Sequence, residues 1–84
     1  MTLTLSEPDL RKRLATNLRT LRGTQGLSQE ALADAASIHR TFVSQVEREL
    51  KNVSLDSIRK LANALGVDPV ELFQPLDTDV NVIK

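Results

Sequence analysis

The 84-residue sequence contains no cysteine, tryptophan or tyrosine, and Phe42 and Phe73 are its only phenylalanines. Because cysteine is absent, neither disulfide bonds nor thiolate metal ligands can stabilise the fold. No apolar run approaches the roughly 20 residues that a membrane-spanning helix requires, and no basic segment followed by an apolar one suggests a secretion leader. We therefore expect one small, soluble, intracellular domain without a membrane partner, whose core consists mainly of leucine, valine, isoleucine and alanine.

Groups that could perform catalysis are equally scarce. His39 is the only histidine, and the sequence contains no glycine-rich phosphate loop, no cluster of metal ligands and no nucleophile paired with a base. We therefore expect a protein that is not an enzyme and that has no cofactor, no metal and no small-molecule ligand. His39 is better interpreted as a polar residue at a helix start than as a catalytic group.

The charges cancel in total but are unevenly distributed along the chain. Residues 10–60 contain ten Lys or Arg against five Asp or Glu, a net charge of +5, whereas residues 61–84 carry −3 and residues 1–9 carry −2. A basic central segment between acidic ends is typical of a surface that faces nucleic-acid phosphates. Ordinary solvated charge is the alternative, and charge alone does not decide between the two.

One pattern of helix initiation recurs five times: an apolar residue, a capping residue, and a second apolar residue four positions into the helix. The five copies are Leu5-Ser6 with Leu10, Leu27-Ser28 with Leu32, Ile38-His39 with Val43, Val53-Ser54 with Ile58, and Val67-Asp68 with Leu72. His39 is the weakest of these caps, and glycines follow the first and fourth helical patterns. The sequence therefore predicts an all-α fold with helices at 6–23, 28–35, 39–48, 54–65 and 69–73.

The two ends of the chain have a different pattern. Residues 2–5 and 79–83 alternate polar and apolar side chains, which is the period of a β-strand. They could pair with each other or across a dimer, but frayed termini are the favoured interpretation.

The predicted helix at 39–48 has two chemically distinct sides. One side is apolar, with Val43, Val46 and Leu50, and the other is polar, with Arg40, Thr41, Ser44 and Gln45. An arginine can donate two hydrogen bonds to a guanine edge, a glutamine can bond adenine in the same bidentate manner, and a threonine offers a hydroxyl and a methyl group. The four polar residues are therefore the candidate readers of DNA bases in the major groove.

Three segments between about Leu18 and Phe73 resemble the Cro/CI (XRE) family of helix-turn-helix regulators: LRGTQGLSQEALA, ASIHRTFVSQVER and NVSLDSIRKLANALGVDPVELF. Within that family, HRTFVSQVER with KN after it is most similar to the controller proteins of restriction–modification systems. The resemblance implies a five-helix lambda-repressor-like domain and a cytoplasmic, nucleoid-associated regulator that activates or represses transcription. A phage repressor, an antitoxin-type regulator and, in a different class, a protein-interaction module that binds no DNA are the alternatives.

The resemblance also assigns the contacts to the DNA backbone. Gln29 falls at the first position of the second predicted helix, where free main-chain amides suit a phosphate. The complete set of expected phosphate-binding residues is Arg22, Ser28, Gln29, His39, Arg48, Lys51 and Asn52. The resemblance further implies a structural ion pair between Arg22 and Glu47, so that Glu47 does not read bases although it lies in the recognition helix.

A homodimer is expected because residues 67–73 hold more apolar surface than a terminal segment needs, and the family pairs through this region. The expected interface residues are Val67, Val70, Leu72 and Phe73. The resulting division is an N-terminal arm at 1–5, a DNA-binding and dimerisation domain at 6–73 and a C-terminal tail at 74–84. Double-stranded DNA, a second copy of the chain and RNA polymerase are the candidate partners.

Three residues near the predicted recognition helix require separate interpretation. Ser37 stands where the family often has glycine in the turn before this helix, which predicts a non-glycine residue in the left-handed region. Glu49 replaces a common glycine after the helix and adds negative charge near phosphate. Phe42 is interpreted as packing in the core or between subunits in preference to wedging into DNA.

Overall fold

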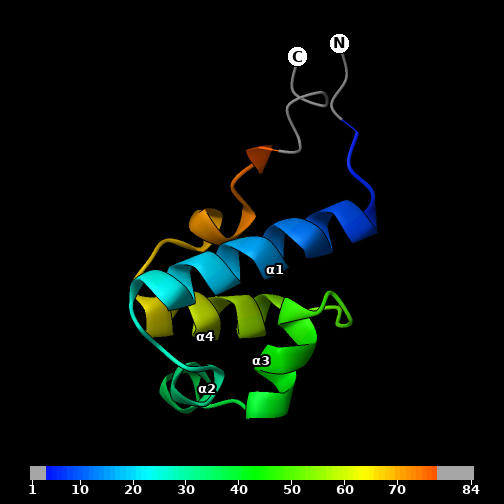
Figure 1. Cartoon of the computed structure of the whole chain (residues 1–84). Coiled ribbons are helices and arrows are strands. Elements are labelled where there is room, and N and C mark those ends of the chain that lie inside the picture. Colours follow the sequence, from blue (N-terminus) through cyan, green and yellow to red (C-terminus); the bar gives the residue numbers. More distant parts are fainter. Residues whose placement is uncertain (1–3, 78–84) are drawn as a thin grey trace.

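The computed structural model describes residues 4–77, and within them the fold is entirely helical. The elements are α1 (Glu7–Thr24), α2 (Gln29–Ala36), α3 (Arg40–Glu47), α4 (Leu55–Leu65) and a 3-10 helix, η1 (Pro69–Phe73). Figure 1 shows α3 rising toward α1, with its N-terminal end far from α1 and its C-terminal end beneath it. No helix among the described residues is long and apolar enough to cross a membrane.

The helix starts were predicted well because their signals are local. Four of the five predicted caps accept a main-chain N–H bond: Ser6 from Asp9 (3.2 Å), Ser28 from Ala31 (2.9 Å), Ser54 from Ser57 (3.1 Å) and Asp68 from Val70 (2.9 Å). At the start of α1 the bond is reciprocated, since the carboxylate of Asp9 accepts from the Ser6 N–H at 2.9 Å. His39 occupies the N-cap of α3 without a capping hydrogen bond from its side chain, which confirms that it is the weak cap.

The fifth predicted helix forms as a single 3-10 helix, so the part of the chain that the structure describes contains four α-helices and not five. The Glu71 N–H bonds the Asp68 carbonyl three residues back, at 2.9 Å, which is the 3-10 spacing. A segment of only five residues has room for very few four-residue-spaced bonds, and short helical segments commonly take the 3-10 form.

The core lies where α1, α2, α3, α4 and η1 meet, and it contains no aromatic residue that is fully buried. Its members are the aliphatic side chains of Leu14, Leu18, Leu32, Ala33, Ala36, Val43, Val46, Ile58, Leu61, Ala62, Leu65 and Leu72. Leu50, predicted on the apolar side of the recognition helix, is 59% exposed. The prediction for Leu50 was wrong because α3 ends at Glu47, so the helical period does not continue to residue 50.

Side-chain amides join elements that are distant in sequence. Asn17 of α1 donates to the carbonyls of Leu72 (3.1 Å) and Gln74 (3.0 Å), which fixes η1 and the residue after it against α1. Gln25 donates to the Leu65 carbonyl at the end of α4, at 2.7 Å. Thr4 and Leu5 lie in no helix or strand, and the rest of the strand-like pattern predicted for 2–5 and 79–83 lies outside the described residues.

Candidate nucleic-acid interface

The two faces of α3 differ in exposure as well as in chemistry. Val43 and Val46 are buried in the core, at 0% and 2% exposure. Arg40 and Thr41, in the first turn of α3, are exposed, whereas Ser44 and Gln45, one turn later, are partly buried. The structure thus leaves the first turn of α3 most open to a ligand, and the later polar residues less so.

The C-terminal end of α3 is fixed by a hydrogen-bonded ion pair with α1. Glu47 is only 4% exposed, and its two carboxylate oxygens accept from Arg22 Nε at 2.7 Å and Arg22 Nη2 at 3.1 Å. Arg22 Nη1 donates to the Leu27 carbonyl at 2.8 Å, so all three guanidinium nitrogens are engaged within the protein. The hydrogen bond to Glu47 raises the pKa of Arg22.

Gln29 belongs to the same network. Its side-chain Nε2 donates to Glu47 Oε1 at 3.1 Å, so this amide group holds α2 against the end of α3. The main-chain N–H groups at the start of α2 lack carbonyl partners within the helix, as at any helix N-terminus, and Ser28 caps only that of Ala31. The part of Gln29 that suits a phosphate is therefore its main chain, while its side chain is committed to the fold.

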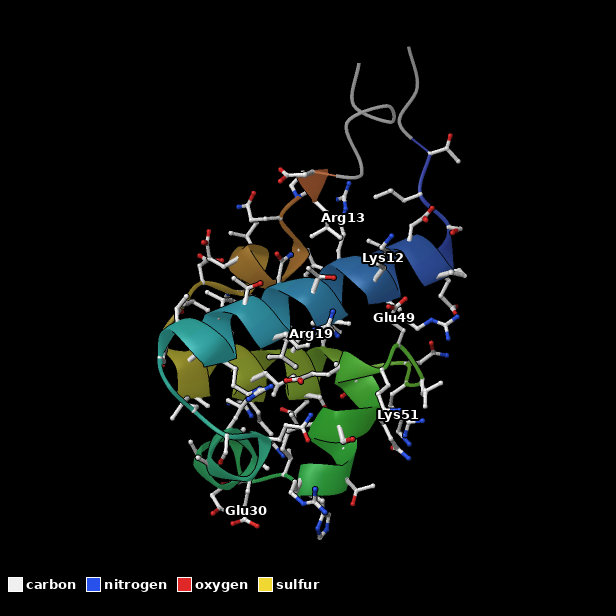
Figure 2. All side chains as sticks on the ribbon, viewed as in Figure 1. Lys12, Arg13, Arg19, Glu30, Glu49 and Lys51 are labelled. Atoms are coloured by element: carbon white, nitrogen blue, oxygen red, sulfur yellow. The ribbon has the colours of Figure 1, made fainter. Side chains whose placement is uncertain are left out.

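The loop between α3 and α4 carries the remaining predicted backbone contacts. Arg48, Lys51 and Asn52 are all exposed, and Figure 2 shows Lys51 on this loop, beside α3. The Lys51 ammonium lies 6.0 Å from the centre of the Phe42 ring, the outer limit of a cation–π contact. Phe42 is partly buried and packs against the core, which agrees with its interpretation as a packing residue.

Left-handed residues bound α3 on both sides. Ser37, the residue that ends α2, has φ 58°, as predicted from its position where the family often has glycine. Glu49, two residues after α3, has φ 63°. Ser28 and His39, at the two helix starts of the helix-turn-helix, are exposed. The orientation of α3 thus depends on two tight turns in which a side chain is present at an unfavourable φ.

The predicted dimer interface needs one correction. Leu72 is 0% exposed because η1 turns this side chain into the core against α1 and α4, so Leu72 cannot contact another subunit in this fold. Val70 is 56% exposed, whereas Val67 and Phe73 are partly buried and pack against the core. Large apolar side chains that the prediction did not include are also exposed, namely Leu10 (40%), Leu50 (59%) and Leu55 (88%).

Arg19 is a residue of this region that the sequence prediction missed. It is exposed on α1, and its Nη1 donates to the main-chain carbonyl of Glu47 at 2.5 Å. The only sequence signal was its spacing, since Arg19 and Arg22 are three residues apart and therefore share a face of the helix.

Among the described residues no group of three or more His, Cys, Asp or Glu could hold a metal ion.

The family model HTH_3, helix-turn-helix, matches residues 18–72, from the middle of α1 into η1. A hypothetical transcription factor of Neisseria meningitidis serogroup B is 48% identical over 69 residues, which cover 82% of this chain and 65% of that protein. The control protein C.BamHI of Bacillus amyloliquefaciens is 51% identical over 47 residues, covering 56% of this chain and 58% of that protein. The chain thus spans less than two thirds of the length of both relatives.

Solved structures share the fold. The controller protein C.AhdI from Aeromonas hydrophila superimposes with a TM-score of 0.73 at 48% identity, over 75% of this chain and 96% of that one. The Neisseria transcription factor NHTF gives a TM-score of 0.79 at 41% identity, over 98% and 100% of the two chains. The controller C.Esp1396I, solved as a tetramer in complex with its natural 35-base-pair operator, gives 0.71 at 28% identity, over 77% and 86%.

Proposed function

The chain belongs to the HTH_3 helix-turn-helix family, and we propose that it is a transcriptional regulator that binds a specific sequence of double-stranded DNA. One observation carries the proposal: the first turn of α3 exposes Arg40 and Thr41 while Val43 and Val46 anchor the opposite face in the core. A helix held in this way can enter a major groove with its N-terminal turn leading.

We assign distinct tasks to the side chains of this surface. Arg40 and Thr41 would contact base edges first, and Ser44 and Gln45 would contact bases deeper along the same side of α3. Ser28, the main chain of Gln29, His39, Arg48, Lys51 and Asn52 would contact phosphates, which set affinity and register without reading sequence. Arg22 would act mainly as a structural residue that joins α1 to the end of α3, because its three nitrogens already donate within the protein.

We also propose that the protein acts as a homodimer on an inverted repeat. Two recognition helices related by a two-fold axis lie about 34–36 Å apart and so meet successive major grooves on one side of the duplex. Val70 and the exposed edges of Val67 and Phe73 would contribute to the interface, with η1 in place of the fifth helix of a lambda-repressor-like domain. The tetramer of C.Esp1396I on its operator supports binding as an oligomer.

Control of a restriction–modification operon is the regulatory role that the relatives favour, since C.BamHI and C.AhdI are both controllers. RNA polymerase would then be a partner where the operator overlaps a promoter, and the site of action would be the bacterial nucleoid. A phage repressor or an antitoxin-type regulator would use the same residues, so the neighbouring genes distinguish these roles. A restriction endonuclease gene beside this one is the expected result.

The test of DNA recognition is a selection of duplexes from a random pool, followed by fluorescence anisotropy on the selected sequence. Arg40→Ala should weaken binding to the selected duplex by about 1–3 kcal/mol and relax the preference at one base pair. Arg40→Lys should lose the same preference while retaining more affinity, because lysine keeps the charge but not the fork of donors.

Arg59→Ala is the matched control, since Arg59 is exposed on α4 and pairs with Asp56 of the same helix at 2.8 Å. It should bind the selected duplex as the unmodified protein does. If the unmodified, folded protein binds no duplex at low salt, the DNA-binding proposal fails and the protein-interaction module becomes the alternative to test.

A further inference from the structure

Glu47, the last residue of α3, is held by α1 at two separate points. Arg22 binds its carboxylate through two hydrogen bonds of 2.7 and 3.1 Å, and Arg19 binds its main-chain carbonyl at 2.5 Å. Because Arg19 and Arg22 are three residues apart on α1, both side chains reach down from the same face of that helix. Figure 2 shows Arg19 midway along α1, on the part of the helix that lies above the end of α3.

We propose that Arg19 is a positioning residue that caps the C-terminal end of α3 and thereby fixes the direction of the recognition helix relative to α1. This inference rests on the proposed DNA-binding function, and it goes beyond the Arg22–Glu47 pair because it concerns the main chain. Val43 and Val46 fix one face of α3 in the core, but the main chain at its C-terminal end can still shift while only the flexible Glu47 side chain holds that end. Attachment of its main chain at a second point removes this freedom to shift.

The chemistry of the end of α3 favours this role. The last carbonyls of any helix have no partner within the helix and carry partial negative charge, so a cation there is stabilising. The last turn of α3 contains no basic residue of its own. Arg48 at the C-cap is exposed, whereas Arg19 donates directly to the Glu47 carbonyl from another helix. Two residues later Glu49 adopts φ 63°, so the position of the Glu47 carbonyl also determines where the loop with Lys51 leaves α3.

A contact between Arg19 and a DNA phosphate is the competing interpretation, because Arg19 is exposed. The two roles differ in their dependence on salt. A phosphate contact releases a counterion, so its loss makes the negative slope of log K against log salt less steep by about 0.9 and weakens specific and non-specific binding alike. A lost positioning contact leaves the slope unchanged and weakens specific binding more, because only the specific complex requires a precise orientation of α3.

The first experiment measures binding of Arg19→Ala and Lys51→Ala to the selected duplex and to an unrelated duplex over a range of salt. Arg19→Ala should weaken specific binding about tenfold, the equivalent of one charged hydrogen bond, with an unchanged slope. Arg19→Lys should recover part of that loss, since it keeps a cation near the helix end. Lys51→Ala, the matched phosphate variant, should make the slope less steep and weaken both complexes. A less steep slope in Arg19→Ala, or an equal loss of affinity for both duplexes, would overturn the proposal.

The second experiment needs no DNA, so it separates failure of this inference from failure of the proposed function. The N–H groups of Arg48, Glu49 and Leu50 bond the carbonyls of Ser44 (3.1 Å), Val46 (3.0 Å) and Gln45 (2.9 Å). In Arg19→Ala, hydrogen exchange at these three amides should accelerate about tenfold while the amides of α4 keep their rates. Unchanged exchange at the end of α3 would overturn the inference. If Arg19→Ala does not fold, Arg19→Lys is compared with the unmodified protein by the same two measurements.

Discussion

The two ends of α3 are built in opposite ways. At the N-terminal end, His39 makes no capping bond through its side chain, and Arg40 and Thr41 are exposed. At the C-terminal end, Glu47 is buried and accepts hydrogen bonds from Arg22, Gln29 and Arg19, which come from two other helices. One end of a short helix can therefore be left open for a ligand when the other end and one face are firmly fixed.

Glu47→Ala should produce the largest effect, because it removes the carboxylate that holds the fixed end. Arg22 and Gln29 would lose their shared acceptor, and a partly buried guanidinium would remain without its counter-charge. We expect a loss of about 3 kcal/mol in the free energy of unfolding, measured by urea denaturation. Glu49→Ala, which removes an exposed carboxylate two residues away, is the control and should change stability little. A loss of stability in Glu47→Ala no larger than that in Glu49→Ala would contradict the assignment of Glu47 as the residue that anchors α3.

Relief of the two left-handed turns should have the next largest effect, and in the opposite direction. Ser37→Gly and Glu49→Gly replace side chains at φ 58° and 63°. Each should stabilise the fold by about 1 kcal/mol net, because a left-handed residue with a side chain costs about 1–2 kcal/mol and glycine loses about 0.5–1 kcal/mol more entropy on folding. Gly66→Ala, at φ 70°, is the reverse control and should destabilise it by about 1 kcal/mol. Melting temperatures should rise in Ser37→Gly and Glu49→Gly and fall in Gly66→Ala.

His39→Ser tests whether the open end of α3 can be closed. A serine at this N-cap can accept a main-chain N–H bond as Ser28 and Ser54 do at α2 and α4. The expected gain in the free energy of unfolding is about 0.5–1 kcal/mol. If the variant is no more stable than the unmodified protein, then the main chain at the start of α3 is not available for a cap.

The smallest effect is expected at the start of α1, which Ser6 and Asp9 cap. The Ser6 N–H, and then the Ser6 hydroxyl, hold the pKa of Asp9 below its usual value of 3.8. Because the folded-state pKa is lowered, the stabilisation is present above about pH 4 and is lost as the pH falls through the folded-state value. Asp9→Asn should therefore be less stable than the unmodified protein at pH 7, and the difference should shrink at pH 3. Urea denaturation at both pH values measures it.

The exposed apolar residues show where sequence patterns stop being sufficient. Leu72 and Val70 both lie in the last apolar segment, yet the first is buried and the second is 56% exposed. Their difference arises from the 3-10 geometry of η1 and from Asn17, which holds the Leu72 carbonyl against α1. A search for apolar residues finds both of them, but only packing decides which is core and which is available to a second subunit.

The helix starts and the two-sided character of α3 could be predicted from the sequence, because capping groups and periodic side chains act within three or four residues. The left-handed turn at Ser37 was predicted from the resemblance to a family that often has glycine at this position. Helix packing alone reveals that the Gln29 side chain turns to Glu47, that Leu72 is buried and that Arg19 reaches the Glu47 carbonyl. Arg19 and Glu47 are 28 residues apart in sequence. Contacts of that kind depend on how helices are packed, and no local signal in the chain specifies the packing.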